Sequence, residues 1–278
     1  MNGQGTLPAR SHLVTMRVGY FQFAPVFGNI TRNLATMSQR LSTVECDLMV
    51  LPELFNTGYQ FVSVDEVRAL AEEIPGGPTT ERLRKLAAER RTHVVAGLAE
   101  RAGNRLFNSA VLVGPGGLIG VYRKTHLFFE ENLFFSPGDT GFPVFDIGPA
   151  RVGLMVCFDW FYPESARTLA LKGADVIAHP SNLVLPHCPD SMVTRCLENR
   201  VFAVTCNRTG WEERGGKERL TYIGNSEVVT PTGEILRRAK SDQETLAVVE
   251  IDPLEARNKR INPYNDLLAG RRPEFYSR

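Results

Sequence analysis

The hydrophobic and polar positions of this chain follow two different periods. Short, nearly continuous apolar runs at 17–24 and 47–53 are typical of strands buried on both faces of a sheet. After the first run, apolar residues recur at helical spacing on one face, at Ile30, Leu34, Met37, Leu41 and Val44. The pattern therefore predicts an α/β fold in which strands and helices alternate.

The alternation continues through the first half of the chain. The breaker "PGGP" precedes a predicted helix over 79–91. Three predicted strands follow, beginning at His93, Asn108 and Gly120, and the turn "GPGG" joins the last two of them. Three long loops interrupt the pattern, after Glu53, Leu127 and Asn207. Extended loops in a compact domain are often lids or walls of a site.

The second half repeats the mixture without an internal repeat or a low-complexity linker. Strands are expected in "VGLMVC", "ADVIAHP", "AVTCN", "NSEVVT" and "LAVVEID". Helices are expected after Pro163, where proline is tolerated in a first turn, and through "TRCLENRVF".

Composition narrows the class of protein. The chain has 278 residues, of which 43% are hydrophobic and 23% charged, so one large domain over 16–278 is the simplest interpretation. Because 32 basic residues nearly cancel 31 acidic ones, no excess field favours nucleic acid or an anionic membrane. A small, neutral or mildly charged ligand fits this balance better.

Two further features bear on the compartment. No apolar run approaches the roughly 20 residues that span a bilayer. We expect residues 1–15 to form a loose N-terminal leader, since they lack the apolar centre of a signal peptide. The five cysteines have no tight spacing, which argues against a disulfide framework. These features predict a cytoplasmic protein with free thiols.

Three polar residues stand where predicted buried strands end: Glu53, Lys124 and Cys157. Ligands of α/β sheets bind beyond the carboxyl ends of strands, so these side chains could meet in one pocket. Each also has a simpler interpretation from its type alone. Glu53 could cap the next segment, Lys124 could be a solvated strand end, and Cys157 could pack in the core.

The segments around these residues favour the first interpretation. "LPELFNTGY", "YRKTHLF" and "GLMVCFDWFYPE" resemble, in order and spacing, the three signature segments of the carbon-nitrogen hydrolase, or nitrilase, superfamily. Supporting matches are "FFSPGD", "RCLENRVF" and "NRTG", and the resemblance runs from about Met16 to "RRPEFY". It implies a single-domain, four-layer αββα sandwich with two sheets face to face.

The resemblance also implies a Glu-Lys-Cys triad. Cys157 would be the nucleophile, Glu53 the general base and Lys124 an electrostatic support, with Lys124 and the backbone N–H of Phe158 holding the oxyanion. The chemistry agrees, because a thiol with an ordinary pKa of about 8.5 needs a base or a cation to become an attacking thiolate. Neither a metal nor an organic cofactor is needed for this chemistry.

Other site residues are implied by the same resemblance. A second glutamate is expected shortly before "SPG", and Glu131 fits this spacing better than Glu130. Side chains expected to line or support the pocket are Tyr59, Trp160, Phe161 and Asn182, with Phe55 as a further candidate. A hydrophobic wall could come from Phe128, Phe129, Phe134 and Phe135, although aromatic residues here could equally pack the core or an interface.

The implied reaction is hydrolysis of small aliphatic amides or nitriles to an acid and ammonia through a Cys157 thioester. An N-carbamoyl amide hydrolase on the same scaffold, or a thiol sensor without enzyme activity, are the alternatives. A papain-like pair with His126 or His179 as the base competes with the triad. His179, His187 and Cys188 give only a weak hint of a metal site, because they lack the usual zinc-ligand spacing.

Assembly is inferred only from the resemblance. Family members commonly pair through the helix after the nucleophile and the helix that here contains "RCLENRVF", so a homodimer or higher homo-oligomer is expected. The tail "NPYNDLLAGRRPEFYSR" would then reach over the partner subunit.

Overall fold

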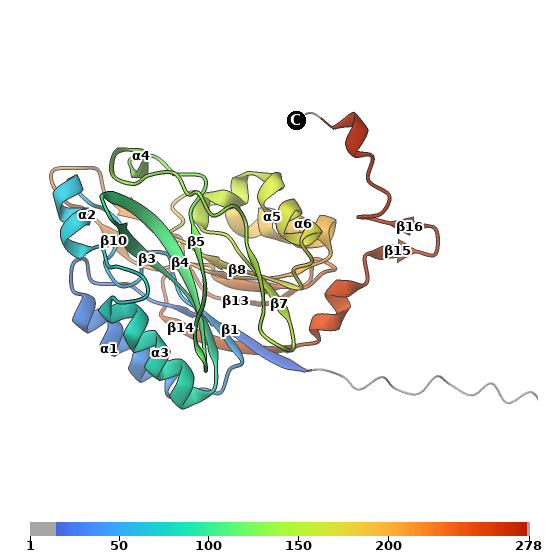
Figure 1. Cartoon of the computed structure of the whole chain (residues 1–278), viewed down its shortest axis with the longest axis horizontal. Helices are drawn as coiled ribbons and strands as arrows, with labels where there is room; N and C mark the ends of the chain where they lie inside the picture. Colours follow the sequence, from blue (N-terminus) through green and yellow to red (C-terminus); the bar gives the residue numbers. More distant parts are fainter. Residues whose placement is uncertain (1–14, 277–278) are drawn as a thin grey trace, which may run out of the picture.

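Two six-stranded sheets lie face to face in the computed structural model, which describes residues 15–276 (Figure 1). The predicted N-terminal leader lies almost wholly outside the described residues. Helices cover the outer face of each sheet, which gives the order helix, sheet, sheet, helix. The α/β class and the four-layer sandwich predicted from the sequence are therefore confirmed.

The first sheet has the order β14-β1-β2-β3-β4-β5, with β1, β2 and β3 parallel and the outer strands antiparallel. Its strands are β1 (Met16–Gln22), β2 (Leu48–Val50), β3 (His93–Ala102), β4 (Arg105–Gly114), β5 (Gly117–Arg123) and β14 (Thr245–Ile251). The turn predicted between the last two strands of the first half joins β4 and β5.

The second sheet has the order β13-β12-β9-β8-β7-β6, and again three neighbouring strands, β7, β8 and β9, are parallel. Its strands are β6 (Val144–Asp146), β7 (Arg151–Leu154), β8 (Val176–Pro180), β9 (Phe202–Cys206), β12 (Glu227–Val229) and β13 (Ile235–Arg238). Two small hairpins stand apart, formed by β10 (Trp211–Glu212) with β11 (Leu220–Thr221), and by β15 (Arg260–Asn262) with β16 (Asn265–Asp266).

The helices divide between the two faces. The first sheet is covered by α1 (Ile30–Leu41) and α3 (Pro78–Arg90), and the second by α5 (Pro163–Leu171) and α6 (Cys188–Asn199). The short helices are α2 (Val64–Leu70) and α4 (Glu131–Phe134), and the single 3-10 turns are η1 (Cys157–Phe161), η2 (Pro253–Arg257) and η3 (Pro273–Phe275).

Alternation along the strands builds two separate apolar layers. In β1, Val18 and Tyr20 pack between the sheets, whereas Phe21 faces α1 and α3. Shifting the pairing register of β1 by one residue would turn its inward side chains outward and its outward ones inward, because side chains of a strand alternate between the two faces of the sheet. The space between the sheets is thus filled, and the polar loops that follow the strands gather at the sheet ends.

The structure has several short strands that the sequence analysis did not predict, among them β6 and β13, and three other differences concern predicted segments. Residues 64–70, which the pattern left in a loop, form α2 because Ser63 accepts a hydrogen bond from the backbone N–H of Glu66 and caps the helix. Helix α6 begins at Cys188, earlier than predicted, and ends at Asn199, because the next residue, Arg200, has a left-handed conformation. The strand predicted to end in Cys157 already ends at Leu154.

Candidate active site

Glu53 lies three residues beyond β2, in a segment held against β3. The N–H of Phe55 donates to the carbonyl of Gly97 (3.0 Å), and the Asn182 amide donates to the carbonyl of Glu53 (2.9 Å). A Cβ at Gly97 would stand 2.5 Å from the Cα of Glu53, so only glycine permits this approach. The Glu53 carboxylate is consequently fixed in a fully buried position.

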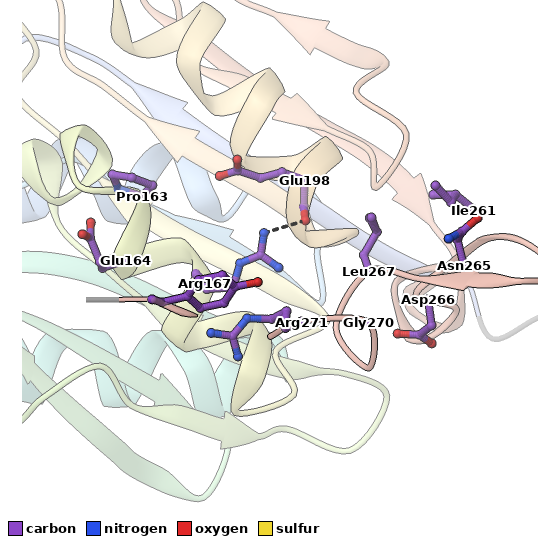
Figure 2. A pocket seen from close by; sticks show the side chains of 11 residues that line it. Pro163, Glu164, Arg167, Glu198, Ile261, Asn265, Asp266, Leu267, Gly270 and Arg271 are labelled. Carbon is purple, nitrogen blue, oxygen red and sulfur yellow. Dashed lines mark hydrogen bonds between the residues drawn. The ribbon is translucent and has the colours of Figure 1, made fainter. Parts of the chain in front are cut away.

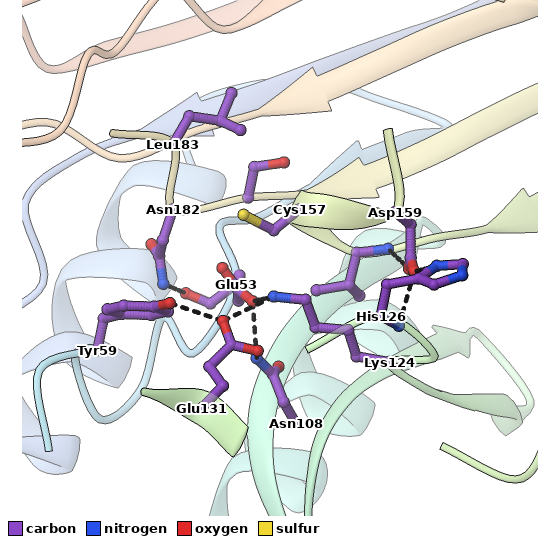
Figure 3. A network of polar contacts seen from close by, with 12 residues as sticks. Glu53, Tyr59, Asn108, Lys124, His126, Glu131, Cys157, Asp159, Asn182 and Leu183 are labelled. Atoms are coloured by element: carbon purple, nitrogen blue, oxygen red, sulfur yellow. Dashed lines mark hydrogen bonds and ion pairs between the residues drawn. The ribbon is translucent and has the colours of Figure 1, made fainter. Parts of the chain in front are cut away.

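Lys124 follows directly after β5, and its Nζ joins two carboxylates. Nζ donates to Oε1 of Glu53 and to Oε1 of Glu131, each at 2.7 Å, and all three side chains are buried (Figure 3). The Asn108 amide also donates to Oε1 of Glu53 (2.7 Å). We call Glu53, Lys124, Glu131 and Cys157 the buried cluster.

Cys157 begins the 3-10 turn η1 with a φ of 43°, a left-handed conformation that costs a non-glycine residue of order 1 kcal/mol or more. The buried carboxylate of Asp159 holds this turn, accepting from the N–H of Val156 (2.8 Å) and the hydroxyl of Tyr122 (2.6 Å). The Cys157 side chain points toward the Glu53 carboxylate (Figure 3). Only one oxygen of that carboxylate is engaged, because Oε2 has no hydrogen-bond partner among the described residues.

Burial sets the protonation of the sulfur. It raises the pKa of the Cys157 thiol well above its ordinary value; Glu53 raises the pKa further, and Lys124 opposes both effects. Burial works against the charge on Lys124 as well, but Glu131 and Glu53 outweigh it and raise the lysine pKa. The arrangement is thus a neutral thiol beside a fixed ammonium, so a base must take the thiol proton during attack.

Glu131, and not Glu130, belongs to the buried cluster. Its Oε1 accepts from the Tyr59 hydroxyl (2.7 Å) as well as from Lys124. Burial raises the pKa of Glu131 to about 7, with Lys124 lowering it and Glu53 raising it. Glu130 instead pairs with Lys217 on the half-buried surface (2.7 Å). The spacing argument that preferred Glu131 thus agrees with the geometry.

A small apolar cavity opens beside the sulfur. It is about 10 Å³, room for the centre of one water molecule, and its lining residues are Phe128, Cys157, Phe158, Trp160, Asn182, Leu183, Val184 and Leu185. Of the predicted pocket residues, Trp160 and Asn182 line this cavity, and Tyr59 lies in the hydrogen-bond network below it. Phe161 is 51% exposed and is not among the lining residues.

The proposed aromatic wall is only partly present in this cavity. Phe128 lines it, whereas Phe129 is 66% exposed. Phe134 and Phe135 pack in a separate cluster near α2, and Phe55 is buried beneath α1 and α3. The segment 183–185, which the sequence reasoning did not consider, supplies the rest of the apolar lining.

The two histidines considered as bases have other partners. Nδ1 of His126 contacts Asp159 (2.8 Å), and its ring stacks on Tyr162. Nε2 of His179 contacts the carbonyl of Cys157 (2.9 Å), while its Nδ1 contacts Thr205 (3.1 Å). Burial lowers the pKa of His179 to about 4. Within residues 15–276 there is no cluster of three or more His, Cys, Asp or Glu side chains that could hold a metal ion.

Sequence reasoning missed the supporting roles of three residues: Asn108, Asp159, and His179, which it considered only as a base or a metal ligand. Asn108 donates to Glu53 and His179 contacts the carbonyl of Cys157, both across the fold, whereas Asp159 holds the turn at Cys157 by accepting from the N–H of Val156. Asp159 offered the only local signal, since it follows the nucleophile by two residues in the motif; the others depend on strand pairing that the sequence does not display.

Comparison with known proteins decides the family. A family model described as carbon-nitrogen hydrolase matches residues 13–260. The chain belongs to the carbon-nitrogen hydrolase family. It is 50% identical over 266 residues to a protein named nitrilase from Pyrococcus abyssi, covering 95% of this chain and 100% of that one. The predicted membership and the predicted enzyme class are therefore confirmed.

Two further comparisons support this assignment. An (R)-stereoselective amidase from a Pseudomonas species is 36% identical over 242 residues, covering 85% of each chain. The crystal structure of a carbon-nitrogen hydrolase from Helicobacter pylori superimposes on this hydrolase with a TM-score of 0.85 at 28% identity, covering 96% of this chain and 98% of that one. Within the described residues of the hydrolase, no helix is both long and apolar enough to cross a membrane.

Proposed function

We propose that this hydrolase cleaves small aliphatic amides or nitriles to the acid and ammonia through a thioester on Cys157. The observation that carries the proposal is the buried cluster, in which a neutral thiol faces a carboxylate with one unengaged oxygen and a fixed ammonium. The relatives named nitrilase and amidase support both substrate classes.

In the first half-reaction Glu53 accepts the thiol proton as Sγ of Cys157 bonds to the amide carbonyl carbon. The carbonyl oxygen becomes an oxyanion, stabilised by the Lys124 ammonium and the backbone N–H of Phe158. Glu53 then returns the proton to the nitrogen, the C–N bond breaks, and ammonia leaves the thioester behind. A nitrile forms a thioimidate first and takes up one water before it loses ammonia.

In the second half-reaction Glu53 takes a proton from water, whose oxygen attacks the thioester carbon. The C–S bond breaks, the acid leaves, and the thiol regains its proton. Glu131 holds the second side of the Lys124 ammonium, which keeps this cation in place through both halves. The apolar lining of the cavity beside Cys157 supports an uncharged acyl group, with Trp160 and Asn182 at its wall.

Ammonia release from an amide, a nitrile and an N-carbamoyl compound with the same short aliphatic group tests the proposal. The wild type and Cys157→Ala are measured side by side. We expect release from the amide or the nitrile that the substitution abolishes. Mass spectrometry of the wild type quenched during turnover should show an acyl adduct on Cys157, and Glu53→Gln should form it much more slowly. Release from the N-carbamoyl compound alone would replace the proposed substrate class, and neither turnover nor an adduct on any of the three would refute the proposal.

A homodimer built on α5 and α6 is part of the proposal. The cleft of about 580 Å³ in Figure 2 lies between these helices and the C-terminal segment, which we define as residues 258–276. Apolar side chains remain exposed beside it, including Leu197 (50%), Ile261 (57%) and Tyr264 (94%). Large exposed apolar surface of this kind is typical of an interface. Light scattering after size exclusion tests this point, and a monomer at micromolar concentration would refute it.

We also propose a cytoplasmic location. All five cysteines are free and buried, which supports a reducing compartment. Fractionation of the source cells with an antibody against this chain would test it.

A further inference from the structure

An ion pair outside the buried cluster is almost as deeply buried as the cluster itself. Arg208 and Glu212 contact each other with side chains only 1% and 5% exposed. Arg208 also donates to the carbonyl of Pro25 (3.3 Å) and lies 4.0 Å from the ring centre of Tyr222. A buried ion pair is costly unless further hydrogen bonds satisfy its atoms, so the remaining partners of this pair show what it holds.

Those partners are two consecutive backbone N–H groups and one tyrosine hydroxyl. Oε2 of Glu212 accepts from the N–H of Tyr59 (3.1 Å) and from that of Gln60 (2.6 Å), and also from the Tyr222 hydroxyl (3.2 Å). The preceding Gly58 has a φ of 84°, and a Cβ there would lie 2.8 Å from Oε1 of Glu212. Glycine therefore lets the carboxylate approach and fix the direction of the chain at Tyr59.

The fixed segment reaches the buried cluster through one side chain. The Tyr59 ring meets Tyr222 edge-on, with centroids 6.2 Å apart, and its hydroxyl donates to Oε1 of Glu131. That same oxygen accepts from Lys124. A continuous set of contacts thus runs from Arg208 through Glu212 and Tyr59 to Glu131.

We propose that Glu212, held by Arg208, is a positioning residue that fixes the Tyr59 hydroxyl on Glu131 and thereby orients Lys124 for catalysis. This inference rests on the proposed function. Glu212 takes no part in the chemistry, and its effect passes through Tyr59.

The first test compares Glu212→Gln with Glu227→Gln. Glu227 is a matched control because it is equally buried and pairs with Arg238 (2.8 Å), but it lies on β12, outside the contacts that reach Tyr59. We expect kcat/KM to fall about tenfold in Glu212→Gln, mainly through kcat, and less than about twofold in the control. Equal losses in both variants would overturn the proposal.

A double-mutant cycle with Tyr59→Phe separates positioning from general destabilisation. If Glu212 acts through the Tyr59 hydroxyl, Glu212→Gln has little further effect in the Tyr59→Phe background. A full additional tenfold loss there would overturn the proposal. Should Glu212→Gln fail to fold, Glu212→Asp keeps the charge and withdraws the carboxylate by one methylene, and the same cycle applies.

The pH profile supplies a readout that a merely structural role would not move. Glu131 faces Lys124, Glu53, Cys157 and Tyr59, and the donated Tyr59 hydroxyl is one of the contacts that lower its pKa. Loss of this donation should raise the pKa of Glu131, so the limb of the pH profile that reports Glu131 should lie at higher pH in Glu212→Gln and in Tyr59→Phe alike. A slower variant whose profile overlays that of the wild type would overturn the proposal.

The crystal structure of Glu212→Gln tests the inference without substrate. We expect the Tyr59 hydroxyl to have moved out of hydrogen-bond distance of Glu131, and a contact kept at its present 2.7 Å would overturn the proposal. A wild type that is inactive on every substrate class would refute the proposed function instead, so the two failures are distinguishable.

Discussion

Two regions of the molecule treat their side chains in opposite ways. The buried cluster pairs its charged side chains with partners in the same chain, whereas the face formed by α5, α6 and the C-terminal segment leaves apolar side chains exposed. In the cluster each charge has partners from the same chain, since Lys124 contacts both Glu53 and Glu131. On the exposed face, Tyr264 is 94% exposed and Phe275 71%. The comparison teaches that the buried cluster is completed within one chain, whereas the exposed apolar face is where we propose that a second copy binds.

Lys124→Ala should break the cluster most severely. The substitution removes the proposed oxyanion donor and leaves two carboxylates buried without their cation, so we expect turnover to fall at least about 100- to 1000-fold. The free energy of unfolding should also fall by about 3 kcal/mol or more. Steady-state ammonia release and urea unfolding measure the two effects.

Lys217→Ala is the control for this prediction. Lys217 forms a half-buried pair with Glu130, one residue away from the cluster member Glu131, and should change turnover much less. Similar losses of turnover in the two variants would contradict the distinction between cluster and surface.

Tyr264→Asp tests the exposed apolar face, where we propose the dimer interface. A charge at this exposed aromatic position should dissociate the proposed dimer, because it would be desolvated at the interface. Light scattering should then report the monomer mass while Cys157 still forms its acyl adduct. Trp211→Asp, at a 56% exposed aromatic residue on the β10–β11 hairpin, is the control and should leave the mass unchanged. A wild type and Tyr264→Asp of equal mass would count against this interface.

Leu183→Ala tests whether the cavity beside Cys157 sets the acyl-chain preference, and we expect a smaller effect than in the two preceding substitutions. Leu183 is 3% exposed and lines the cavity beside Cys157, so its truncation enlarges the proposed acyl site. The preference is measured as the ratio of kcat/KM for a longer to a shorter aliphatic amide. This ratio should rise about tenfold, because burying one or two extra methylenes of the substrate in an apolar pocket has an effect of this size. Leu171→Ala, on the exposed side of α5, is the control, and an unchanged ratio in Leu183→Ala would place the acyl group elsewhere.

The smallest effect concerns a carboxylate buried outside the cluster. Burial raises the pKa of Glu227 from 4.5 to about 7, against the lowering effect of Arg238. Between these two values the folded state binds a proton that the unfolded state releases, so the free energy of unfolding falls as pH rises from about 4.5 to about 7. Glu227→Gln cannot ionise and should therefore show a shallower fall over that window.

Urea unfolding at several pH values between 4.5 and 8 checks this slope. Glu234→Gln, at an exposed glutamate, is the control and should retain the slope of the wild type. A Glu227→Gln slope equal to that of the wild type would show that Glu227 does not take up a proton on folding.

The sequence by itself determined the alternation of strands and helices, the family, and the positions of Cys157, Glu53 and Lys124. It could do so because apolar periodicity is a local property and the three signature segments are contiguous. Even the choice of Glu131 over Glu130 followed from local spacing.

Only the tertiary structure decided what surrounds these residues. Asn108 reaches Glu53 across 55 positions of the chain, and Glu212 reaches Tyr59 across 153, so no local pattern records either contact. The apolar lining at 183–185 was missed for the same reason, because burial depends on what packs against a segment. Helix α2, by contrast, has a local signal in its N-cap Ser63, which the loop interpretation overlooked. Strand pairing and sheet packing bring these distant segments together, and there a buried charge acquires both its partners and its pKa.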